Sequence, residues 1–81
     1  MNDNLDYRVQ AELFPAPRHR RGQLAYHRFD SLAEALRFAM EELTPPQLTG
    51  AFIEADEVRY SAAEIAALYN ASGYPLTRKS N

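Results

Sequence analysis

Apolar and polar side chains alternate along the first part of the chain. A period of two is typical of a strand with one buried and one solvated face, and it favours an antiparallel sheet. The chain leaves this pattern at Pro15 and Pro17, which cannot donate to a ladder. The apolar positions are Tyr7, Val9, Ala11 and Leu13, and the polar positions between them are Arg8, Gln10 and Glu12.

Three further short strands are predicted. Residues 24–29 follow a long loop, so their antiparallel pairing with the first strand is favoured but not required. Residues 51–55 and 57–60 predict a hairpin around Asp56, although no Asn-Gly or Asp-Gly pair marks its turn. The inward residues that we expect from the second strand are Leu24 and Tyr26.

A helical period replaces the alternation after Asp30. Ser31 precedes Glu34 by three residues, which is the capping-box spacing at a helix start. Pro45 and Pro46 end this helix, because the residue before a proline is restricted away from helical angles. The apolar stripe consists of Leu32, Ala35, Leu36, Ala39, Met40 and Leu43.

The helix start is repeated thirty residues later, where Ser61 precedes Glu64. We expect Gly73 to end this second helix in a left-handed conformation, with Tyr74 folding back on Tyr69. The repetition has two explanations, a duplication or convergence on good capping chemistry, and the sequence leaves both open. The stripe of the second helix is Ile65, Leu68 and Tyr69.

These elements predict an α+β fold: an antiparallel sheet of three to four strands with two helices on one face, in the order β-β-α-β-β-α. The other face would be solvated, with Arg8, Gln10, Glu12 and Glu54 on it, or covered by a second copy of the chain. The expected core is Tyr7, Val9, Leu13, Leu24, Tyr26, Leu32, Leu36, Met40, Leu43, Ile53, Val58, Ile65, Leu68 and Tyr69.

Length and composition refine this prediction. The 81 residues predict a single domain, 1–81, with frayed ends at 1–4 and 77–81. A hydrophobic content of 46% is too high for a disordered chain. The chain has no cysteine, no apolar run of membrane-spanning length and no signal-peptide pattern at its start, so we expect a cytoplasmic protein without disulfides.

The net charge of −2 conceals two opposed blocks. Residues 15–29 carry four arginines and no acid, whereas residues 30–64 carry eight acids and two arginines. The loop residues Arg18, Arg20 and Arg21 are therefore candidate contacts for an acidic protein or for nucleic-acid phosphates, with Arg78 and Lys79 as further contacts. A solvated loop without a partner explains the same residues.

Two other features suggest contact surfaces. The second helix is rich in alanine and poor in charge, so Ala63 and Ala67 are candidate contacts for a partner or a second copy. Alanine is also the best helix former and tolerates exposure. Phe38 lies at the flank of the first apolar stripe, where it either widens the core or faces a partner.

Catalytic and metal chemistry find little support. The acids Glu54, Asp56, Glu57 and Glu64 lack the spacing of a calcium loop and are expected to be solvated. His19 and His27 have no partner at ligand spacing. We find no nucleophile with a base and no glycine-rich phosphate loop, so we expect no enzyme activity, cofactor or metal.

The sequence therefore favours a non-catalytic protein-interaction or regulatory module, with an unknown protein partner or self-association. The alternative is a nucleic-acid-binding accessory protein that uses the 18–21 arginine loop. The helix start at residues 28–36 is similar in composition to many short bacterial proteins, and this resemblance implies no particular activity.

Overall fold

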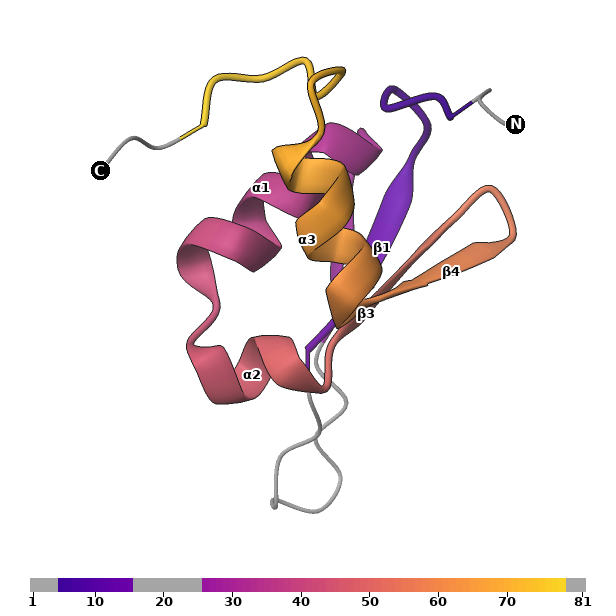
Figure 1. The fold of residues 1–81 in the computed structure, drawn as a ribbon. Helices are drawn as coiled ribbons and strands as arrows, with labels where there is room; N and C mark the ends of the chain where they lie inside the picture. The colour runs from indigo at the N-terminus through magenta and orange to yellow at the C-terminus, as the bar shows by residue number, and fades with distance from the viewer. Residues whose placement is uncertain (1–4, 16–25, 79–81) are drawn as a thin grey trace.

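The computed structural model describes residues 5–15 and 26–78, which form an α+β domain. Three helices and four strands are present in this part of the chain (Figure 1). In chain order they are β1 (Ala11–Phe14), β2 (His27–Phe29), α1 (Leu32–Glu42), α2 (Pro45–Thr49), β3 (Phe52–Ala55), β4 (Val58–Ser61) and α3 (Ala62–Asn70). The predicted fold class is confirmed, with α2 as an addition.

The four strands form one antiparallel sheet in the order β2-β1-β3-β4. Helices α1 and α3 lie beside each other over one face of this sheet (Figure 1). On that face Leu13 is paired with Ile53 and Ala11 with Ala55, and all four side chains are buried. The central strands and the two helices therefore enclose a single hydrophobic core.

Most of the predicted core residues lie in this core. Five large side chains are fully buried, namely Leu13, Leu32, Leu36, Ile53 and Ile65. Tyr69 is also buried, as is Tyr74, which the prediction omitted from the core. Packed against them, and partly exposed, are Tyr7, Val9, Met40, Leu43 and Leu68.

Strand β1 begins at Ala11, four residues later than the alternation predicted. The reason lies at the start of α1, where the first N–H groups have no partner within the helix. The backbone N–H of Leu32 donates to the carbonyl of Val9 at 2.6 Å, and that of Ala33 donates to Tyr7 at 3.0 Å. The residues before β1 therefore stabilise a helix end, while their side chains still pack against the core.

The inward face predicted for the second strand is wrong by one residue. Phe29 is paired with Ala11, so Phe29 and His27 lie on the helix side. Tyr26 is 46% exposed and stacks on Phe14, which lies on the open side of the sheet. Because side chains alternate, a shift of one residue moves the whole strand pattern to the opposite face. Leu24 lies outside the described residues.

All three helices begin at a serine or threonine. The hydroxyl of Ser31 accepts the N–H of Glu34 at 3.1 Å, which confirms Ser31 as the cap of α1. Glu64 accepts the backbone N–H of Ser61 at 2.8 Å in the capping box of α3.

Helix α2 was missed because its two prolines were interpreted as a stop signal alone. Thr44 and Gln47 form a full capping box, and Pro45 occupies the first helical position. Proline is well tolerated there, because the N–H that it lacks has no partner within the helix at that position. The same spacing that marks the other two helix starts was therefore present here.

The end of α3 differs from the prediction. The helix ends at Asn70, and its cap Ala71 is extended with φ −70°, so a left-handed Gly73 does not terminate it. Arg78 instead donates to the carbonyls of Tyr69 and Ala71, each at 2.7 Å. A guanidinium at this end also complements the negative pole of the helix dipole.

Tyr74 connects this end to the core. Its ring lies 5.1 Å from that of Tyr69, as the sequence predicted, and its hydroxyl donates to the carbonyl of Ala33 at 2.8 Å.

Candidate binding pocket

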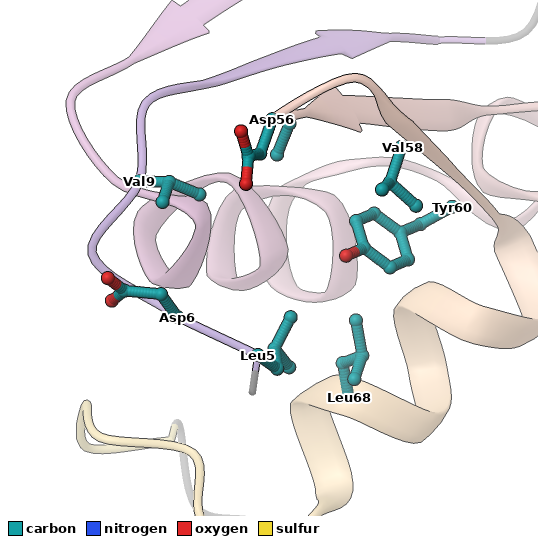
Figure 2. Close-up of a pocket in the computed structure, with 8 residues that line it drawn as sticks. Leu5, Asp6, Val9, Asp56, Val58, Tyr60 and Leu68 are labelled. Atoms are coloured by element: carbon teal, nitrogen blue, oxygen red, sulfur yellow. The ribbon is translucent and has the colours of Figure 1, made fainter. Parts of the chain in front are cut away.

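A pocket of about 420 Å³ opens between the β3–β4 hairpin, α3 and the segment before β1 (Figure 2). The apolar side chains that line it come from all three elements, so it depends on the tertiary fold. Its lining residues are Leu5, Asp6, Val9, Ala55, Asp56, Val58, Tyr60 and Leu68. The volume lies within the usual range of small ligand sites.

Val58 was predicted as a core residue, and this prediction is wrong. Val58 is paired with Ala55 and so lies on the helix side of the sheet, yet it is 46% exposed. It belongs to the tip of the hairpin, where no helix residue covers it completely. This incomplete cover at the tip is what creates the pocket.

The hairpin turn consists of Asp56 and Glu57 alone. Their φ angles are +52° and +67°, as in the type I′ turns that connect two-residue hairpins. Left-handed backbone is costly for side chains other than those of glycine, asparagine and aspartate. The turn therefore holds the Asp56 carboxylate at the pocket rim with a strained, well-defined backbone.

Tyr7 fixes the opposite wall. Its hydroxyl donates to the carbonyl of Leu68 at 3.0 Å, and its ring packs edge-on against Tyr74 at 5.7 Å. Burial raises the pKa of Tyr7, so its hydroxyl stays protonated and continues to donate at neutral pH. This bond links Leu5, Asp6 and Val9 to α3.

Three polar groups line the pocket. The Tyr60 hydroxyl points into it (Figure 2), and the pKa of Tyr60 is raised by burial and then by the nearby Glu64 and Asp56 carboxylates. Asp6 is held by Arg8, with Asp6 Oδ1 3.1 Å from Arg8 Nε, and the bonds from Arg8 lower the pKa of Asp6. Asp56 has no ion-pair partner among the described residues.

The open face of the sheet has a different character. A charged row crosses all four strands, because Arg28 bonds Glu12 at 3.4 Å and Arg59 bonds Glu54 at 3.0 Å. Of the four residues expected on this solvated face, Glu12 and Glu54 lie on it and are partly exposed, whereas Arg8 and Gln10 precede β1.

An aromatic column lies beside this row, formed by Tyr26, Phe14, Phe52 and Arg59. The Phe14 ring lies 5.3 Å from Tyr26 and 4.8 Å from Phe52, and the Arg59 guanidinium lies 4.2 Å from the centre of the Phe52 ring. The sequence analysis did not assign Phe14 and Phe52 to a face. Their cross-strand pairing is the signal that places them together.

None of the predicted contact residues within the described ranges lines the pocket. Arg18, Arg20 and Arg21 lie outside the described residues, as does Lys79. Phe38 is partly buried and packs 5.0 Å from His27 and 5.5 Å from Phe29, so it widens the core beneath β2. Ala63 and Ala67 are exposed on α3.

Sequence reasoning missed most of the pocket. The one local signal for it is the acidic pair Asp56 and Glu57 at the hairpin turn. The sequence singled out Asp56, but we expected its side chain to be solvated and not to line a pocket. Among residues 5–15 and 26–78, no group of three histidine or acidic side chains is placed to bind a metal ion.

Comparisons with known proteins add no assignment. The chain matches no protein-family profile, no curated protein and no solved structure. Over the described part of the chain, no helix has both the length and the hydrophobicity needed to cross a membrane. The pocket and its chemistry are therefore the basis for assigning a function.

Proposed function

We propose that this protein is a non-catalytic interaction module that binds a segment of a partner protein in the hairpin pocket. The observation that carries the proposal is an open apolar pocket whose rim includes Asp56, a carboxylate without an ion-pair partner among the described residues. Val58 remains nearly half exposed beside it, although its cross-strand partner Ala55 is buried. Exposed apolar surface of this kind is typical of contact sites.

The polar groups of the pocket suit recognition better than bond making. A phenol is protonated at neutral pH, and burial raises the pKa of Tyr60 further, so its hydroxyl can donate a hydrogen bond to a ligand. The two other polar groups are carboxylates on separate elements, Asp6 before β1 and Asp56 in the hairpin turn. Acceptors and a donor around an apolar centre fix the orientation of a bound side chain.

The alternative function, nucleic-acid binding, draws on the arginine loop and on the aromatic column. The column provides little stacking surface, because Phe14 lies between two rings and Phe52 between Phe14 and the Arg59 guanidinium. Glu12 and Glu54 beside it also repel phosphates. The pocket therefore supports the protein-interaction function better.

A selection from a displayed library of random peptides tests the first proposal. Peptides recovered on the full chain should lose at least about tenfold in affinity for Val58→Lys, which places a charge on the apolar wall. They should bind Ala67→Lys unchanged, because Ala67 is exposed on α3 and does not line the pocket. An amide spectrum of each variant checks that it is folded.

Equal binding of the peptides to wild type and Val58→Lys contradicts the pocket as the site. Loss of binding only in Ala67→Lys assigns the contact to the alanine face of α3 instead. Recovery of no peptide at all counts against a peptide-binding module.

A salt titration separates the nucleic-acid alternative. Binding of a labelled single-stranded oligonucleotide that weakens steeply between low and physiological salt, and that is lost in Arg18→Ala/Arg20→Ala/Arg21→Ala, supports it. Absence of binding at low salt excludes it.

A further inference from the structure

The charge around the pocket is one-sided. Among the described residues that line it, none carries a positive charge, whereas two are aspartates. Arg59 is the nearest cation along β4, and it is paired with Glu54 on the open face of the sheet. Arg8 is committed to Asp6. The Asp56 carboxylate therefore faces the pocket without a counter-ion among the described residues.

The surroundings of Tyr60 are consistent with this negative field. Burial raises the pKa of Tyr60 most, and the charges of Glu64 and Asp56 add to this by disfavouring the phenolate. Glu64 does not line the pocket, since it caps α3, but its charge reaches the phenol. A ligand with a carboxylate would meet the same repulsion, whereas a cation would be attracted.

The walls select a ligand that is apolar along most of its length. Leu5 and Val9 line the space from the segment before β1, Leu68 lines it from α3, and Val58 closes it from the hairpin (Figure 2). An arginine side chain has an aliphatic stem that packs on such walls, with a planar cationic head at its end.

We propose that the pocket receives an arginine side chain from a basic segment of a partner protein. This inference rests on the proposed function, and it adds the chemistry of the partner. The guanidinium donates to the Asp56 carboxylate and stacks against the Tyr60 ring, while its stem covers Val58 and Leu68. Guanidinium donors diverge in one plane, which suits acceptors that lie on separate walls.

Matched short peptides test the inference. The probe is an acetylated and amidated five-residue peptide with a central arginine between glycines, and its counterparts carry citrulline, lysine or norleucine at the centre. Citrulline has the shape of arginine without its charge. Each is titrated into the isotope-labelled full chain while the methyl signals of Val58 and Leu68 are followed by NMR.

We expect the arginine peptide to bind at least about tenfold more tightly than the citrulline peptide, the ratio that one charge-assisted contact typically gives. Asp56→Asn should remove most of that difference, and it should fold, because asparagine tolerates the left-handed turn. Glu42→Gln is the matched control, since it removes one charge from an exposed residue of α1 that does not line the pocket.

The outcomes separate this inference from the proposed function. Equal binding of the arginine, citrulline and norleucine peptides at Val58 and Leu68 overturns the charge argument and leaves the pocket as a binding site. If the lysine peptide binds as tightly as the arginine peptide, the proposed preference for a guanidinium is wrong. Shifts confined to Glu54 and Glu57 on the hairpin tip indicate unspecific attraction and overturn the inference. If no library-selected peptide depends on Val58 either, the proposed function fails as well.

Discussion

The two edges of the sheet face the same helical layer, yet they are covered differently. At the β2 edge, Phe29 and His27 pack against Phe38 of α1, with ring centres 5.5 and 5.0 Å apart. At the β4 edge, the equivalent positions are Val58 and Tyr60, and a pocket remains beside them. One edge is packed against an aromatic side chain of a helix, although His27 stays exposed, and the other retains a pocket.

The difference follows from where each helix lies along its neighbouring strand. Helix α3 begins at Ala62, directly after β4, so its start lies at the end of the strand that is remote from the hairpin turn. The residue of α3 that reaches the pocket is Leu68, two turns later. The comparison teaches that a binding site can arise where a connection is too short for a helix to cover its strand.

The largest expected effect tests whether the β2 edge is filled. Phe38→Ala should lower the free energy of unfolding by about 2–3 kcal/mol, because a half-buried aromatic ring is removed from a packed cluster. Val58→Ala at the open edge should cost less than about 1 kcal/mol, because the lost methyl groups already face solvent. Urea denaturation of both variants measures the difference. Equal costs at the two edges would mean that the comparison is wrong.

High pH should destabilise the domain through its partly buried and buried tyrosines. Burial raises the pKa of Tyr74 to about 12, and burial also raises the pKa values of Tyr7 and Tyr60. The unfolded chain releases these protons near its ordinary pKa of about 10, so the stabilisation is complete below that pH and is lost as the pH rises toward 12. The phenylalanines of the β2 edge do not titrate.

Denaturation midpoints at about pH 8 and pH 11 measure this loss, because a raised native pKa favours unfolding only above the unfolded pKa. In Tyr74→Phe the midpoint should be lower at pH 8, where the bond to Ala33 is missing, and should fall less on going to the higher pH. If Tyr74→Phe loses as much stability between pH 8 and pH 11 as the wild type, Tyr74 does not contribute to the pH dependence.

The hairpin turn provides an effect of the opposite sign. Glu57 has a φ of +67°, so Glu57→Gly should stabilise the fold by about 1 kcal/mol through relief of the left-handed strain. Glu57 does not line the pocket, so peptide binding should be unchanged. Thermal unfolding measures the first effect and NMR titration the second. A destabilised Glu57→Gly would show that the turn is not strained.

The smallest expected difference concerns the open face. Arg28 and Arg59 make comparable exposed ion pairs at opposite edges, and such pairs contribute about 0–1 kcal/mol. Arg59 also covers the Phe52 ring, so Arg59→Ala should cost about 0.5 kcal/mol more than Arg28→Ala. A double-mutant cycle with Phe52→Leu isolates this contribution.

Local sequence patterns predicted the fold well where a residue type favours a single kind of structure at its position. The serine caps and the helical stripes located α1 and α3, since capping and amphipathic periodicity act within a few residues. Thr44 was overlooked because proline both stops one helix and starts the next. The prolines after Thr44 were interpreted only as the end of α1, although they also fit the start of α2.

The pocket was not predictable in the same way. Alternation correctly assigned Val58 to the helix side, but whether a helix covers that position depends on distances between elements remote in sequence. The prediction that Tyr26 faces the core was wrong for a related reason. Only the pairing of Phe29 with Ala11 determines which face of β2 is inward. Tertiary packing, rather than the pattern within a strand, determines both outcomes.

The position of β1 has a consequence for how the domain forms. This strand comes first in the chain but lies in the interior of the sheet. Its residue Leu13 pairs with Ile53, which is about 40 residues later in the sequence, so the pairing of β1 is completed only by a distant segment. The helix starts are encoded locally and form quickly, whereas closing the sheet requires loop closure across half the chain. During synthesis, α1 therefore emerges before the strand that completes its core, and the domain gains its stability only late, when β3 joins β1.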